Sequence, residues 1–288
     1  MAEMAASVVV LLERLLPTSS GPERRVYEAM RYAVLNGGKR FRPFLAVTSA
    51  ELFDVPRSCA LRVAAAVELV HCYSLVHDDL PAMDDDALRR GKPTVHVHYD
   101  EATAILAGDA LQTLAFEVLA ELETHPRARV RCDLIHLLAI AAGAPGMVGG
   151  QMMDLQAENM AMDIGTITRL QQMKTGALIA FSCESGAVLG EARDVERHAL
   201  HAYAHDLGLA FQIQDDLLDI EGDVARTGKA VQKDQDAGKA TFVSILGVER
   251  AREQAKILAD QAIAHLDLFG EKAELLARAA HFVVMRQH

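Results

Sequence analysis

Apolar residues recur every three or four positions along most of this chain, which is the spacing of helices with one buried face. The clearest case lies within residues 60–77, where one such face carries Leu61, Ala65, Leu69, Cys72 and Val76. The same spacing predicts further helices over residues 100–123, 129–143, 166–190, 196–221 and 240–266. The alternation typical of strands is nearly absent. We therefore predict an all-α chain of about ten or more helices, arranged as a bundle around a central cavity.

Composition supports one large helical domain over residues 1–288. The chain is 51% apolar, has no tryptophan, and is dominated by alanine, leucine and valine, which favour helices over sheets. We find no linker, low-complexity run or domain boundary. A net charge of −11 argues against nucleic acid as the main partner.

The cysteines and the N-terminus indicate a cytoplasmic setting. Cys59, Cys72, Cys132 and Cys183 are scattered without a CxxC pair, as expected for thiols in a reducing compartment. The first apolar run has no basic leader and contains acidic residues, so it reads as a helix rather than a signal peptide. We judge that no apolar stretch is long enough to span a bilayer.

Two acidic clusters stand out, DDLPAMDDD at residues 78–86 and DDLLD at residues 215–219, and each follows a long apolar helix. In a bundle, two such helices can lie side by side with their acidic ends facing one cavity. Asp215 and Asp219 are four residues apart, which places them on one helix face about 6 Å apart along the axis. Asp216 lies beside them. Carboxylates at this spacing suit a hard cation with oxygen ligands.

The first cluster needs a break in its helix. Asp78 and Asp84 are six residues apart, so on a continuous helix they would point roughly 120° away from each other. Pro81 disfavours helical geometry in the residue before it. We expect the helix to end near Asp79 and the chain to curl back, bringing Asp84 towards Asp78. A lone acidic run is more often a solvated loop, but its repetition after two apolar helices favours Mg²⁺.

Basic residues accompany these clusters, and arginine and lysine are the residue types that bind phosphate. The candidates are Lys39, Arg40, Arg42, Arg89, Arg90, Lys174, Lys229 and Lys239. Each alone would be an ordinary solvated charge, and His71 alone would be an ordinary core histidine. Their placement beside glycines and acidic clusters favours a phosphate site. In GGQMMDLQ, Gln151 and Asp154 form either a polar patch or a buried hydrogen-bond pair, and we favour the buried role for Asp154.

With these motifs in this order, the chain resembles the trans-isoprenyl diphosphate synthases, or polyprenyl synthetases, and most closely the bacterial farnesyl diphosphate synthases. The resemblance covers nearly the whole chain, through GGKRFRP, HCYSLVHDDLPAMDDDALRRGKPTVH, GGQMMDL, KTGALI and FQIQDDLLDIEGD. It implies an isoprenoid-synthase fold, a homodimer and a prenyltransferase. The implied reaction is head-to-tail condensation of isopentenyl diphosphate with dimethylallyl or geranyl diphosphate, and it releases diphosphate.

The resemblance also implies roles for individual residues. The ligands of about three Mg²⁺ ions would be Asp78, Asp79, Asp84, Asp215, Asp216 and Asp219. Contacts to the allylic diphosphate would come from Arg89, Lys174, Lys229 and Lys239. Thr175 and Gln212 match residues near the allylic carbon. Isopentenyl diphosphate would meet Lys39, Arg42, His71 and Arg90. In the family the final proton passes to the leaving diphosphate, so no protein base is needed.

Product length is expected to depend on bulk just upstream of the first acidic cluster. Tyr73 and Ser74 stand five and four residues before Asp78, and Tyr73 would close the pocket about 7 Å below the metal end. Together with the inserted Pro81 and Ala82, this resembles enzymes that make the C15 product, farnesyl diphosphate. A small residue there would indicate the C20 product, geranylgeranyl diphosphate. Tyr73 as plain core packing is compatible with either.

Other function classes fit less well. A class I terpene cyclase would share the first acidic motif, but DDLLD and GGKRFR both count against it. A non-catalytic partner subunit typically loses an acidic motif, and both are intact here. A Mg²⁺-dependent phosphohydrolase would need a placed nucleophile or base, and none stands out.

Overall fold

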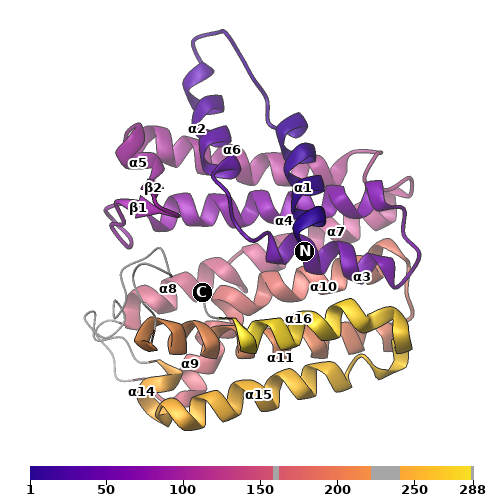
Figure 1. The fold of residues 1–288 in the computed structure, drawn as a ribbon. Coiled ribbons are helices and arrows are strands. Elements are labelled where there is room, and N and C mark those ends of the chain that lie inside the picture. Colours follow the sequence, from indigo (N-terminus) through magenta and orange to yellow (C-terminus); the bar gives the residue numbers. More distant parts are fainter. Residues whose placement is uncertain (158–161, 222–240, 287–288) are drawn as a thin grey trace. The chain divides into compact units, whose positions relative to one another are not determined.

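In a computed structural model, described for residues 1–157, 162–221 and 241–286, the chain is almost wholly α-helical (Figure 1). Within these ranges the only strands are β1 (Leu88–Arg89) and β2 (Lys92–Pro93), which pair antiparallel. The prediction of an all-α fold is confirmed. The described residues form two compact units, one of Met1–Val47 and Val55–Ile135, and one of Thr48–Asp54 with the chain from His136 onward.

The first unit holds seven helices in whole or in part, and two of them, α3 and α7, run on into the second unit. They are α1 (Ala2–Leu15), α2 (Arg24–Leu35), α3 (Phe41–Glu51), α4 (Arg57–Asp78), α5 (Val95–His98), α6 (Glu101–Ala120) and α7 (Ala128–Ala142). Helix α4 packs along α6. The His77 ring of α4 lies against Gly108 of α6, where any side chain would collide with the ring.

Helix α4 explains why one sequence prediction was wrong. Every residue from Val63 to Val70 is buried, and a helix that is apolar all round is one surrounded by protein or lipid. By length and composition, three helical stretches are apolar enough to cross a membrane: Arg57–Asp78, Glu101–Ala120 and Ala128–Ala157. Our expectation that no stretch is long enough is therefore corrected. In α4, 67% of the most apolar window is buried within the protein.

The second unit is built around the long helix α11. Its remaining elements are α8 (Met147–Ala157), α9 (Ile164–Gln171), the π-helix η1 (Gln172–Gly176), α10 (Ala177–Leu189), α11 (Asp194–Glu221), α14 (Phe242–Leu246), α15 (Val248–Ala264), the 3₁₀-helix η2 (Asp267–Ala273) and α16 (Glu274–Met285). Helix α11 packs against α10, α15 and α16. Tyr203 of α11 is fully buried, and its hydroxyl donates to the Leu276 carbonyl oxygen at 2.8 Å.

Two long predicted helices of this unit differ in outcome. The one over residues 166–190 is present, with the π-turn η1 between α9 and α10. The one over residues 240–266 is broken at Gly247, whose φ of 79° ends α14 before α15 begins. Glycine adopts this left-handed conformation without steric cost, which is why helices often end there.

Candidate active site

The first acidic cluster forms the turn that ends α4. Asp78 is the last helical residue, and the backbone N–H of Asp84 donates to the Asp78 carbonyl oxygen at 2.8 Å. Asp86 N–H likewise returns to the Asp79 carbonyl oxygen at 3.2 Å. Asp85 takes a positive φ of 49°, a conformation that aspartate tolerates in turns. The predicted curl after Asp79 is confirmed.

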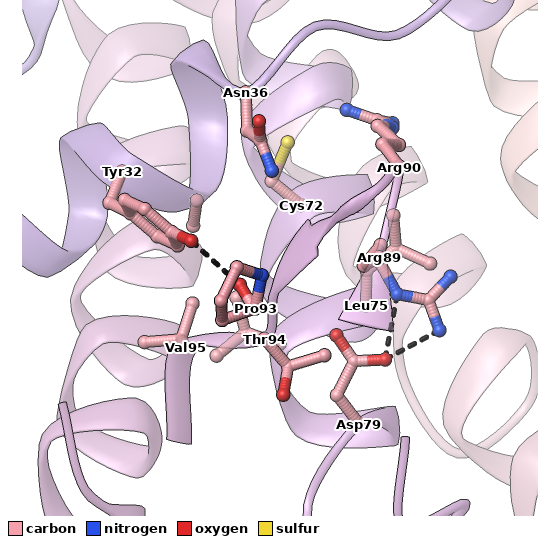
Figure 2. A pocket seen from close by; sticks show the side chains of 12 residues that line it. Tyr32, Asn36, Cys72, Leu75, Asp79, Arg89, Arg90, Pro93, Thr94 and Val95 are labelled. Atoms are coloured by element: carbon pink, nitrogen blue, oxygen red, sulfur yellow. Dashed lines mark hydrogen bonds and ion pairs between the residues drawn. The ribbon is translucent and has the colours of Figure 1, made fainter. Parts of the chain in front are cut away.

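Asp79 is the buried member of this cluster, 3% exposed, and it is paired with Arg89 (Figure 2). Arg89 Nε and one terminal nitrogen lie 2.7 and 2.5 Å from Asp79 Oδ1, and the same nitrogen lies 3.4 Å from Asp86 Oδ2. Burial raises the pKa of Asp79, and Arg89 opposes that shift. Arg89 reaches the carboxylate from β1 of a tight hairpin, whose turn residues Arg90 and Gly91 have φ values of 53° and 75°.

Two of the residues predicted to bind isopentenyl diphosphate, Arg42 and Arg90, lie near a third, His71. Burial, followed by the guanidinium groups of Arg42 and Arg90, lowers the pKa of His71 well below its usual value. Arg90 donates to the Gly37 carbonyl oxygen, and its guanidinium carbon lies 2.7 Å from where a Cβ on Gly38 would be. Only glycine allows this approach, since Gly38 also has a φ of 118°. Lys39 follows in the same loop.

A small cavity of about 30 Å³ lies beside these residues. Its walls come from α2, α4 and the hairpin, and Figure 2 shows Asn36, Cys72, Arg90 and Thr94 among the residues around it. Its lining includes Asp79 and Arg89, so the cavity belongs to the first acidic cluster.

The second acidic cluster lies near the end of α11. Asp216 is 3% exposed, and its two carboxylate oxygens accept hydrogen bonds from Phe242 N–H at 3.0 Å and Gln212 Nε2 at 3.1 Å. Thr175 of η1 donates its hydroxyl to Gln212 Oε1 at 3.2 Å. Three predicted site residues, Thr175, Gln212 and Asp216, thus form one hydrogen-bonded chain. Asp219 is half-buried on the next turn.

Arg286 is a site residue that sequence reasoning missed. One of its terminal nitrogens lies 2.7 Å from Asp215 Oδ1, and the same nitrogen donates to the Phe211 carbonyl oxygen at 2.9 Å. Its guanidinium lies 3.9 Å from the centre of the Phe211 ring, and the side chain is 7% exposed. No motif surrounds Arg286 in the sequence, and Asp215 is 71 residues away along the chain, so no local signal marked it.

Lys174 is placed by the π-turn η1 against α8. Its ammonium lies 2.6 Å from Asp154 Oδ2, and a side chain at Gly150 would collide with the Lys174 backbone. Asp154 therefore makes its largely buried pair with Lys174 rather than with Gln151, which corrects the expected pairing. Gln151 is buried, and neither atom of its amide has a hydrogen-bond partner within the described ranges.

The two residues predicted to set product length are close to the first acidic cluster. Tyr73 is 5% exposed and meets the His77 ring edge to face at 5.7 Å. Burial, followed by Asp78, raises the pKa of Tyr73 to about 12, against a smaller opposing effect of Gln112. Its hydroxyl makes no hydrogen bond of good geometry in the part of the chain that is described. Ser74 donates to the His71 carbonyl oxygen at 2.9 Å. Lys229 and Lys239 lie outside the described residues.

The acidic side chains suit Mg²⁺ by their chemistry. No group of three or more His, Cys, Asp or Glu side chains among the described residues is arranged to hold a metal ion by itself. Mg²⁺ does not require such a group, because it binds one or two carboxylates and completes its shell with waters and substrate phosphates. Asp84 is exposed, and Asp78, Asp215 and Asp219 are half-buried, so these carboxylates are accessible.

Comparisons with known proteins agree on one family. The sequence model described as Polyprenyl synthetase matches residues 23–275. The chain is 46% identical to a farnesyl diphosphate synthase of Escherichia coli over 278 residues, covering 94% of this chain and 91% of the relative. It is 41% identical to a geranylgeranyl diphosphate synthase of Cyanophora paradoxa, covering 91% and 88%.

Solved structures agree. An apo FPP/GFPP synthase from Zymomonas mobilis is 53% identical, with a TM-score of 0.92 and coverage of 98% of this chain and 97% of that one. A geranyltransferase from Helicobacter pylori, complexed with magnesium and isoprenyl diphosphate, is 34% identical, with a TM-score of 0.84 and coverage of 98% and 94%.

Proposed function

This chain belongs to the polyprenyl synthetase family and is a prenyltransferase, and we propose that it condenses isopentenyl diphosphate with dimethylallyl or geranyl diphosphate to give farnesyl diphosphate. One observation carries the proposal. Both acidic clusters are intact, and each combines a buried, hydrogen-bonded aspartate with accessible carboxylates. They occur in a chain 46% identical to a farnesyl diphosphate synthase along 94% of its length.

In the proposed reaction the acidic residues serve as Mg²⁺ ligands, namely Asp78, Asp79, Asp84, Asp215, Asp216 and Asp219. Bound Mg²⁺, about three ions as in the family, supplies positive charge that helps the diphosphate to leave. The H. pylori structure, which contains magnesium and isoprenyl diphosphate, supports this cofactor. Arg89, Lys174, Lys229 and Lys239 add cations for the same diphosphate.

The remaining residues bind and orient the two substrates. Thr175 and Gln212 place their hydrogen-bonded oxygens near the allylic carbon, where they favour developing positive charge. Lys39, Arg42, His71 and Arg90 hold the diphosphate of isopentenyl diphosphate. Its double bond attacks the allylic cation, and the proton that is lost passes to the released diphosphate. Apolar helix walls exclude water that would otherwise trap the cation.

The C15 product is supported by the farnesyl diphosphate synthases among the relatives and by Tyr73, whose buried ring lies within one and a half turns of Asp78. The C20 product is the second candidate, because a geranylgeranyl diphosphate synthase is 41% identical. The two products differ by one isoprene unit, so whether Tyr73 closes the pocket decides between them.

The test is a product assay with a matched pair of variants. Purified protein is incubated with Mg²⁺, isopentenyl diphosphate and geranyl diphosphate, and the products are identified by mass spectrometry. We expect a C15 product from the natural chain and from Tyr73→Phe, which keeps the ring, and a longer product from Tyr73→Ala. A C20 product from the natural chain would contradict the role of Tyr73 but not the reaction class. No condensation would contradict the proposed function.

The setting of the enzyme is part of the same proposal. We infer a single catalytic domain that works in the cytoplasm as a homodimer, without a membrane span. The family match over residues 23–275 covers most of both units, which supports a single domain. The burial of 67% of the most apolar window of α4 supports the absence of a span there.

A further inference from the structure

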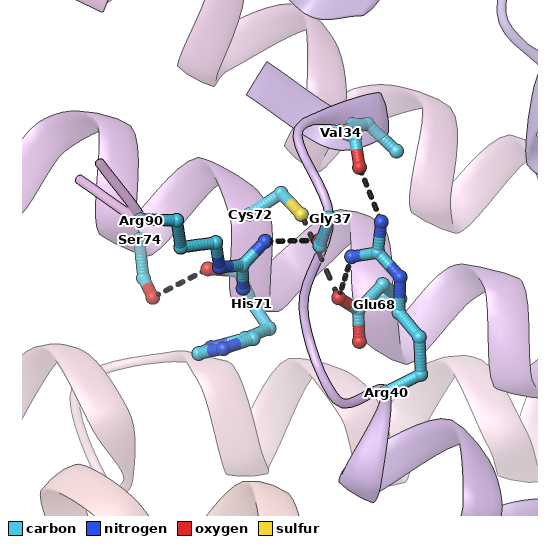
Figure 3. A network of polar contacts seen from close by, with 8 residues as sticks. All are labelled: Val34, Gly37, Arg40, Glu68, His71, Cys72, Ser74 and Arg90. Atoms are coloured by element: carbon cyan, nitrogen blue, oxygen red, sulfur yellow. Dashed lines mark hydrogen bonds and ion pairs between the residues drawn. The ribbon is translucent and has the colours of Figure 1, made fainter. Parts of the chain in front are cut away.

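A buried ion pair joins α4 to the loop between α2 and α3 (Figure 3). The side chains of Arg40 and Glu68 are 1% and 2% exposed, and one terminal nitrogen of Arg40 is hydrogen-bonded to Glu68 Oε1. The other donates to the Val34 carbonyl oxygen at 2.6 Å. Neither residue has a part in the proposed chemistry.

Stability alone is a poor explanation for this pair. Removing two charges from water is costly, and buried ion pairs are often replaced by apolar residues without loss of stability. Glu68 is the only charged residue in the buried run from Val63 to Val70. Arg40 also holds a left-handed backbone conformation, with a φ of 51°, that most residues avoid. Two unfavourable features at one contact indicate a role beyond packing.

The pair fixes both ends of the loop at residues 36–39. Arg40 lies where the loop enters α3, and its guanidinium reaches back to Val34 in the last turn of α2. Between these ends, Gly37 accepts a hydrogen bond from Arg90, and Gly38 lies against the Arg90 guanidinium. Arg40 thus holds the loop from the side of α4, while Arg90 contacts it from the hairpin.

Glu68 places a negative charge beside a group of cations, since it pairs with Arg40 and interacts electrostatically with Arg90. His71, one turn further along α4, has Arg42, Arg90, Arg89 and Arg40 within electrostatic range. The thiol of Cys72 also lies close to Glu68, with its sulfur 3.9 Å from Oε1. Burial, followed by Glu68, raises the pKa of Cys72 to about 12, so this thiol stays neutral and adds no second negative charge.

We propose that Arg40 and Glu68 are positioning residues for isopentenyl diphosphate, which hold the loop so that Lys39, Arg42 and Arg90 present their cations to one diphosphate. Lys39 precedes Arg40, Arg42 follows it by two residues, and Arg90 contacts the same loop. The inference rests on the proposed function, because it assigns the pair to one of the two substrates of that reaction. It requires that a change in the pair raises the KM for isopentenyl diphosphate without raising the KM for geranyl diphosphate equally.

The test is Glu68→Gln, which keeps the shape of the side chain and removes its charge. We expect the KM for isopentenyl diphosphate to rise about tenfold or more, while the KM for geranyl diphosphate changes less than about twofold. The matched control is Glu121→Gln, which disrupts the Arg62–Glu121 pair of the same unit. It should lower the thermal midpoint without separating the two KM values. Equal changes in both KM values for Glu68→Gln would overturn the inference.

A second variant separates positioning from folding. Arg40→Met combined with Glu68→Leu replaces the ion pair by apolar contacts, so it should recover the thermal midpoint. We expect its KM for isopentenyl diphosphate to remain raised, and a return to the natural value would overturn the inference. Failure of the natural chain to condense the substrates would instead refute the proposed function, and this inference with it. If the natural chain is active and the variants match it, only the inference fails.

Discussion

The two acidic clusters hold a buried aspartate in different ways. In the first, Asp79 is neutralised by a full positive charge, the guanidinium of Arg89 at 2.5 Å. In the second, Asp216 accepts hydrogen bonds from the Phe242 N–H and the Gln212 amide. A hydrogen bond to an ionised partner is stronger than one to a neutral partner. When the carboxylate is removed, however, the charged partner stays buried and unpaired, which costs more stability than an unpaired neutral donor. The first cluster should therefore be more sensitive to mutation.

The backbone differs as well. The second cluster lies on a continuous helix, so the spacing of Asp215 and Asp219 follows from helix geometry alone. The first cluster depends on a turn closed by four backbone hydrogen bonds, which run from Met83 and Asp85 to Leu80, from Asp84 to Asp78 and from Asp86 to Asp79. A turn of this kind is set by a few positions, and a change at one of them alters the whole arrangement.

The largest expected effect comes from Asp79→Ala and Asp216→Ala. Both should lower the rate of condensation by about 10²-fold or more, because each removes a proposed metal ligand. They should differ in stability. Asp79→Ala leaves the largely buried Arg89 without its main partner, at a cost of about 3–5 kcal/mol, whereas Asp216→Ala leaves the Phe242 N–H and the Gln212 amide without their acceptor, at about 1–3 kcal/mol. Denaturant unfolding measures both, and a greater loss in Asp216→Ala would reverse the comparison.

The next largest effects are expected from substitutions of two arginines, Arg89 and Arg286. Arg89→Gln should reduce activity by about 10²-fold, since it removes a proposed diphosphate contact and leaves Asp79 buried without its cation. Arg286→Gln should reduce activity by less than about tenfold. It should also lower the Mg²⁺ concentration that gives half-maximal rate, because Arg286 and Mg²⁺ compete for Asp215. Initial rates measured across a Mg²⁺ titration test this. An unchanged Mg²⁺ requirement in Arg286→Gln would exclude the competition.

A smaller effect is expected in the β1–β2 hairpin, which contains Arg89. Gly91 has a φ of 75°, so Gly91→Ala should cost about 1–2 kcal/mol of strain and lower the thermal midpoint by about 2–4 °C per kcal/mol. The control is Gly165→Ala in α9, where helical geometry makes alanine equal to or better than glycine. Thermal unfolding compares the two, and equal midpoints would show that the hairpin tolerates distortion.

The smallest effect concerns His201 on α11, the helix that carries the second cluster, and its partner Glu184 on α10. The hydrogen bond with Glu184 raises the pKa of His201 above the ordinary histidine value of about 6.5. The protonated pair therefore stabilises the fold fully below about pH 6.5, and this contribution is lost as the pH rises through the raised pKa.

His201→Gln should consequently lower the thermal midpoint at about pH 5 and leave it unchanged at about pH 9. The His201 side chain is 61% exposed, so solvent screening should keep the effect below about 1 kcal/mol, in contrast to the buried Glu68 pair on α4. A larger effect at high pH would contradict the assigned sign.

The sequence was sufficient wherever the cause is local. Helical spacing predicted α4 and α11 and their acidic ends, and Pro81 predicted the turn that returns Asp84 to Asp78. It failed at Gly247, where one glycine within a helical pattern ends a helix. It also failed for the apolar length of α4, because a helix buried on all sides has the composition of a membrane helix.

Partners distant in sequence were decided by tertiary structure alone. Nothing near Asp215 indicates Arg286, and nothing near Asp154 or Glu68 indicates Lys174 or Arg40. The physical reason is that 3.6 residues per turn fixes which side chains share a helix face, whereas an ion pair depends on which helices pack together. The sequence by itself therefore determined the helices, the acidic motifs and the family. Only the tertiary structure decided which charge neutralises which.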